Sequence, residues 1–148
     1  MKKKWISLLL LVCCIAFIWG NSLQDGIAST KRSERVTEIV NGMGTDLAAS
    51  EKVIRKAAHF SEFCLEGICI VFVFASFGIL EKSKLSGMVL TGVLTALVDE
   101  TIQLIPADRS SQVTDVWIDT GGVLAGIGIC FLMIAIYRKV SYNGTRCR

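Results

Sequence analysis

The chain has 148 residues, of which 52% are hydrophobic, and its 16 basic and 13 acidic residues give a net charge of +3. A mean hydropathy of +0.55 excludes a disordered protein, because disordered chains are poor in apolar residues. The length favours a single domain over residues 1–148 rather than a two-domain enzyme. The small basic excess is spread along the chain, which argues against a nucleic-acid partner. These properties favour a small integral membrane protein.

Four apolar segments, at about 5–23, 60–80, 85–105 and 116–137, are candidates for membrane spans. Each approaches the ~20 residues that a helix needs to cross the hydrocarbon layer. Lipid offers no water to the backbone polar groups, so helices are expected. The predicted fold class is therefore all-α, an integral membrane four-helix bundle. Lysines precede the first segment as in a signal peptide, but no small-residue cleavage motif follows, so we expect an uncleaved anchor.

The long loop between the first two segments carries a helical pattern of its own. Val36, Ile39, Val40 and Met43 recur at helical spacing, which predicts a short amphipathic helix at the membrane interface. Ser50 and the glutamate after it then predict the start of the second helix. Basic residues are more numerous on the side of the two termini, which predicts cytoplasmic termini and an outer position for this loop.

Polar residues interrupt the apolar segments at one end, which lies on the outer side in this topology. They share helix faces, as His59 and Glu62 do on the second helix and Asp115 and Asp119 on the fourth. The sequence therefore predicts an outer polar pocket. Its residues are Lys56, His59, Glu62, Glu66, Asp99, Glu100, Gln103, Arg109, Asp115 and Asp119.

Small residues predict where the helices pack. Gly122 and Gly126 continue the stripe that Asp115 and Asp119 begin, and Gly92 lies on the third helix. Glycines four residues apart let a neighbouring helix approach closely. We therefore expect the carboxylates to face the bundle interior or a water-filled mouth rather than lipid.

Two interpretations of the polar residues remain open. An acidic residue at the bilayer centre costs ~2.5–3.5 kcal/mol on insertion scales, so these acids need partners. They could form salt bridges with Lys56 and Arg109, or they could line a site that binds a ligand. No metal site and no cofactor are predicted, because HExxH and DxD spacings are absent. No catalytic residue is assigned either, since no Ser-His-Asp arrangement is recognisable.

Four polar motifs occur in order along the chain. They are Asn21-Ser22-x-Gln24, Arg55-Lys56-x-x-His59-Phe60-x-Glu62-Phe63, Asp99-Glu100-x-x-Gln103-x-x-Pro106-x-Arg109 and Asp115-x-x-x-Asp119-x-x-Gly122. Over about residues 5–137 the chain resembles the VanZ-like family, with Asp119 where that family usually has Asn. The resemblance implies a bacterial multi-span protein. It also implies a link to low-level teicoplanin resistance without a changed peptidoglycan precursor terminus, but no reaction.

The sequence thus predicts a VanZ-like protein of the bacterial cell membrane that affects teicoplanin susceptibility or the cell envelope. Expected partners are the lipid bilayer and a cell-wall precursor, a lipid-linked ligand or a lipoglycopeptide. The alternative is a membrane enzyme for a lipid-linked phosphate or isoprenoid, with His59 and Glu62 as acid–base groups and Arg109 on the phosphate. A structural partner of another membrane protein is the third hypothesis. The non-enzymatic hypothesis is preferred.

Overall fold

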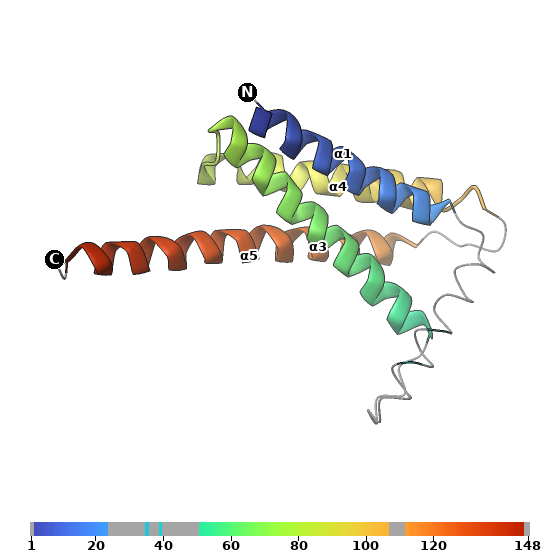
Figure 1. Cartoon of the computed structure of the whole chain (residues 1–148). Coiled ribbons are helices and arrows are strands. Elements are labelled where there is room, and N and C mark those ends of the chain that lie inside the picture. Colours follow the sequence, from blue (N-terminus) through green and yellow to red (C-terminus); the bar gives the residue numbers. More distant parts are fainter. Residues whose placement is uncertain (1, 24–34, 36–38, 40–50, 107–111, 147–148) are drawn as a thin grey trace.

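The computed structural model describes residues 2–23, 35, 39, 51–106 and 112–146 (Figure 1). Its helices are α1 (Lys2–Ser22), α3 (Glu51–Phe77), α4 (Leu85–Ile102) and α5 (Val113–Arg146), with a 3₁₀ turn η1 (Lys82–Lys84). The described residues contain no strand. Four stretches are long and apolar enough to cross a membrane, namely Lys2–Ser22, Val53–Phe77, Lys82–Ile102 and Val113–Tyr142. The predicted all-α bundle of four membrane helices is confirmed.

The helix bounds differ from the apolar segments for local reasons. Helix α3 begins at Glu51, where the sequence predicts a helix start, and runs through His59 into the apolar segment. Helix α4 ends at Ile102, and the amides of Leu104 and Ile105 then bond to carbonyls three residues back, as in the Ile105 N to Ile102 O bond of 3.0 Å. The residue before Pro106 disfavours helical geometry, which explains this tight ending. The interfacial helix predicted over 36–43 falls mainly outside the described residues.

Helix α3 crosses the bundle and makes its most extensive contacts with α5, while it also packs on α1. Figure 1 shows α1 and α4 side by side, and α3 running obliquely across α5. Ile18, Phe63, Ile70, Met88 and Val123 are fully buried between the four helices. Many large apolar side chains face outward instead, as expected of a surface in contact with lipid.

Glycines set the α3–α5 crossing. A side chain at Gly122 would collide with the backbone of Phe60, and one at Gly126 would collide with the carbonyl of Cys64. From the other side, a Cβ at Gly67 would collide with the carbonyl of Val123. The two backbones therefore touch without intervening side chains, as at close crossings of membrane helices.

The two ends of the bundle differ in character. At one end α1 begins and α3 ends, since Lys4 Nζ lies 5.1 Å from the centre of the Phe77 ring. Gly78, with φ of 75°, then terminates α3 in the left-handed conformation that glycine adopts most readily. We call this the basic end, after Lys2, Lys3, Lys4, Lys82, Lys84 and Arg138. The opposite end, where α3 and α5 begin and α4 finishes, is called the polar end.

Candidate functional site

Three side chains from three different helices meet at the polar end. His59 Nδ1 of α3 lies 3.9 Å from Asp99 Oδ2 of α4 and 3.9 Å from Asp119 Oδ1 of α5. One ligand atom from each of the three lies within 4.8 Å of the others. We call these three residues the central cluster. The side chains of Asp99 and Asp119 are 0% and 1% exposed, whereas that of His59 is 17% exposed.

The glycine crossing explains why these residues meet. Gly122 brings α5 against the backbone of Phe60, which directly follows His59. Asp119 precedes Gly122 by one helical turn, so it lies beside the imidazole. Asp99 enters from the last turn of α4, because α4 also packs on α5.

Hydrogen bonds hold the α4 side of the central cluster. Gln103 Nε2 donates to Asp99 Oδ2 at 2.8 Å, one turn away on the same helix. Glu100, which follows Asp99 in the sequence, accepts through its Oε2 a hydrogen bond of 3.0 Å from the backbone amide of Gln112. This bond ties the end of α4 to the start of α5. Asp99 is therefore oriented by its neighbours.

Asp119 is supported differently. Within the part of the chain that the structure describes, neither of its two buried carboxylate oxygens has a hydrogen-bond donor. Its one ion contact there is the 3.9 Å approach to His59 Nδ1, which is too long for a hydrogen bond. Burying a carboxylate without such bonds is costly. Asp119 thus faces the imidazole with its hydrogen-bonding capacity unused.

Further polar contacts link the helices around the central cluster. Asn21 Nδ2 of α1 donates to Glu62 Oε1 of α3 at 2.8 Å. Lys56 Nζ lies 2.8 Å from Asp115 Oδ1, and both side chains are partly exposed, at 39% and 28%. Glu66 is fully buried on α3, nearly two turns after His59. All four helices therefore contribute polar groups to this end.

Comparison with known protein families gives a match over most of the chain. A family model described as VanZ/LLP1 matches residues 7–134, which is most of the chain. The chain belongs to the VanZ/LLP1 family. Comparisons with curated proteins and with solved structures find no significant match. The VanZ-like match and the four apolar helices together make this a multi-pass membrane protein.

The VanZ-like chain's predicted site residues fall into three groups. His59, Asp99 and Asp119 come together directly, with Gln103 bonded to Asp99. Lys56 and Asp115 pair with each other, as the salt-bridge interpretation expects for these two. The remaining residues divide by their contacts: Glu62 contacts α1, Glu100 contacts the start of α5, and Glu66 is buried deeper in the bundle. Arg109 lies outside the described residues, so its predicted role at a phosphate stays a prediction.

Two features of this VanZ-like bundle are absent from the predicted residue set. Asn21 binds Glu62, and its place in the first polar motif is the signal that could have found it. Gly67 belongs to the α3–α5 crossing, but a single glycine in an apolar run carries no signal of its own.

The sequence also predicts no metal site, whereas the structure brings an imidazole and two carboxylates within ligand distance of one another. An imidazole between two carboxylates can exchange a proton or bind a cation.

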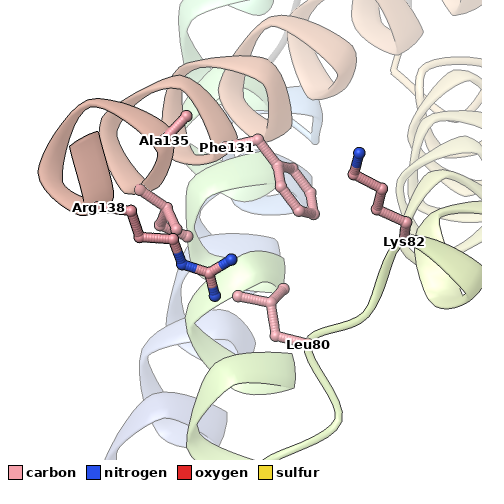
Figure 2. A pocket seen from close by; sticks show the side chains of 6 residues that line it. Leu80, Lys82, Phe131, Ala135 and Arg138 are labelled. Atoms are coloured by element: carbon pink, nitrogen blue, oxygen red, sulfur yellow. The ribbon is translucent and has the colours of Figure 1, made fainter. Parts of the chain in front are cut away.

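A pocket of about 590 Å³ lies at the basic end, which is the end of the bundle opposite the central cluster. Figure 2 shows Phe131 and Arg138 of α5 reaching toward Leu80 and Lys82 in the α3–α4 connection. Two cationic side chains above an apolar wall suit the headgroup region of a membrane. This pocket contains none of the predicted site residues of the VanZ-like protein.

Proposed function

We propose that this protein lowers the susceptibility of a bacterial cell to teicoplanin, through binding of an envelope ligand at the central cluster. Membership of the VanZ/LLP1 family supports the phenotype. The burial of Asp99 and Asp119 beside His59, within a bundle of apolar membrane helices, carries the proposal. Ionisable residues inside a membrane protein mark functional sites by default, because their burial opposes stability.

The charge distribution supports an outward orientation of the central cluster. Lysines and an arginine crowd the basic end, including Lys82 and Arg138 beside the pocket. Basic residues that flank membrane helices favour the cytoplasmic side. The polar end would then face the cell wall, where a cell-wall precursor, a lipid-linked ligand or the lipoglycopeptide itself arrives.

The test is drug susceptibility in a teicoplanin-sensitive Gram-positive host. Wild-type protein should raise the inhibitory concentration of teicoplanin but not that of vancomycin, relative to empty vector. His59→Ala and Asp119→Asn should return teicoplanin susceptibility to the vector level, because each removes one member of the central cluster. Glu81→Gln, which removes an exposed carboxylate near the basic end, should behave as wild type.

Protein abundance is measured in the same cells by immunoblot of the membrane fraction. Resistance that persists in both cluster variants at wild-type abundance would exclude the central cluster as the origin of the phenotype. Wild-type protein without any effect on teicoplanin susceptibility would exclude the phenotype itself for this chain.

A second candidate is an enzyme that acts on a lipid-linked phosphate or isoprenoid at the outer leaflet. The observation in its favour is the position of His59 Nδ1, 3.9 Å from each of two buried carboxylate oxygens, because acid–base catalysis needs such groups near one another. Purified protein in detergent would be assayed for phosphate release from undecaprenyl-type phosphates, with and without Mg²⁺. Phosphate release by wild-type protein that Asp119→Asn abolishes would favour the enzyme. If wild-type protein releases no phosphate, the binding function remains.

A further inference from the structure

We propose that His59, Asp99 and Asp119 bind a divalent transition-metal cation of the Zn²⁺ type. The three helices deliver one imidazole nitrogen and two carboxylates, whose ligand atoms lie within 4.8 Å of one another. This inference rests on the proposed function only in taking the central cluster as the binding site. It names the chemical class of the ligand, and metal binding can be measured without any resistance phenotype.

The carboxylate of Asp119 is the independent observation that points to a ligand. It is 1% exposed and directed at His59, and within the described ranges neither of its oxygens accepts a hydrogen bond. A structural carboxylate at such a position would normally be satisfied by donors, since an unsatisfied buried charge is strongly destabilising. A bound cation supplies what the described protein groups around Asp119 do not.

Charge and distance both suit a divalent ion. Two ionised carboxylates and a neutral imidazole carry a charge of −2, which one divalent cation neutralises. Zinc lies about 2.0–2.2 Å from nitrogen and oxygen ligands, so tetrahedral ligand atoms stand about 3.4 Å apart. The present separations of 3.9 Å from His59 Nδ1 need a closure of only about half an ångström.

The donor set selects among cations. Mg²⁺ and Ca²⁺ prefer six or more oxygen ligands, many of them water or carbonyl oxygens. Imidazole nitrogen together with carboxylate oxygen suits zinc and its transition-metal neighbours. Three protein ligands also leave one tetrahedral position open, as in zinc sites that bind a further ligand.

The surroundings resemble those of a metal centre. Gln103 Nε2 holds Asp99 Oδ2 at 2.8 Å, which is the kind of outer hydrogen bond that orients a ligating carboxylate. One turn deeper on α3 and α5, Phe63 and Val123 are fully buried, and Glu66 is buried below them. Burial of this kind limits water access and strengthens the attraction between the ion and its ligands.

Metal binding is tested on the full chain, purified in detergent, with its affinity tag removed and its metal stripped by a chelator. Titration with Zn²⁺ alone, followed calorimetrically and by competition with a fluorescent chelator, should give one site per chain. His59→Ala and Asp119→Asn should each weaken binding at least ~10-fold, a loss typical of altered metal ligation. Glu81→Gln should bind as wild type, and Mg²⁺ should compete poorly.

Circular dichroism and gel filtration establish that each variant is folded before the titration. Replacement of zinc by Co²⁺ adds a spectroscopic signature, because tetrahedral cobalt absorbs intensely in the visible range and the signal should vanish in Asp119→Asn. Zinc binding that both cluster variants retain would overturn the proposal, since it would originate from the free cysteines or another surface group. An absence of zinc binding by wild-type protein would overturn it as well.

The outcome is separable from that of the susceptibility experiment. Loss of teicoplanin resistance in the cluster variants without metal binding would leave the proposed function in place with a different ligand. Metal binding without a resistance phenotype would support the metal site and exclude the proposed function.

Discussion

At the scale of single residues, Asp119 is the most informative position in the molecule. The resemblance to the VanZ-like family leads us to expect Asn here, and Asn and Asp have nearly the same shape. Asp differs by an ionisable carboxyl group, and in this bundle that group is buried beside a second carboxyl group and an imidazole. A position that opposes stability in this way is typical of a residue retained for binding or chemistry.

This reasoning predicts opposite effects of Asp119→Asn on stability and on function. In detergent with a chelator present, the variant should unfold at a higher temperature than wild type. The expected gain is about 1–3 kcal/mol, because a buried carboxyl group whose oxygens accept no hydrogen bond from the described part of the chain is replaced by an amide that can donate to neighbouring acceptors. Thermal unfolding followed by circular dichroism measures the difference.

Zinc provides the control for this comparison. A saturating concentration of Zn²⁺ should raise the unfolding temperature of wild-type protein much more than that of Asp119→Asn, since a ligand stabilises only the state that binds it. An unfolding temperature for the chelator-treated variant below that of wild type would show that Asp119 supports the fold instead.

At the scale of helices, the glycines of α5 differ sharply in their surroundings. A Cβ at Gly126 would collide with the carbonyl of Cys64 and come within 3.0 Å of the amide of Ile68. Two residues later, Gly128 faces open space, with no atom within 4 Å of its hypothetical Cβ. The two positions therefore form a matched pair on one helix, one at the α3 crossing and the other on the outer surface.

Gly126→Leu should separate α3 from α5 and destabilise the bundle by about 3 kcal/mol or more, because neither helix backbone can give way. Gly128→Leu should be nearly neutral, since the added side chain extends into the surrounding lipid or detergent. The yield of monodisperse protein in mild detergent and its unfolding temperature measure both effects. Equal behaviour of the two variants would contradict the crossing.

The sequence alone predicts the elements better than their mutual arrangement. Hydropathy locates four membrane helices, and the Ser50 signal locates the start of α3. Helical spacing also shows that Asp99 and Gln103 share one face, and these two residues are hydrogen-bonded. The rotation of one helix against another is set by backbone collisions such as that at Gly67, which no one-dimensional pattern encodes. The meeting of His59 with one acid each from α4 and α5 is therefore visible only in three dimensions.

At the scale of the whole molecule, the proposed orientation makes a topology prediction. Two reporter proteins are fused in turn to the C-terminus in a Gram-negative host. With the basic end inside the cell, the green fluorescent protein fusion should be fluorescent, and the alkaline phosphatase fusion, which needs the periplasm for activity, should be inactive. Phosphatase inserted into the loop between α1 and α3 should be active. The reverse pattern would place the central cluster on the cytoplasmic side and exclude direct contact with extracellular glycopeptide.

The helices of this bundle also differ greatly in length. Helix α5 has 34 residues and extends about 51 Å, while α4 has 18 residues and extends about 27 Å. A hydrocarbon layer about 30 Å thick cannot match both without adjustment. The last turns of α5, which project past the other helices in Figure 1, would then stand among the headgroups or in the aqueous phase. On the α4 side, the η1 turn and α4 together only just cross that layer, so lipid headgroups, and any ligand attached to them, would lie close to the acids where α4 ends.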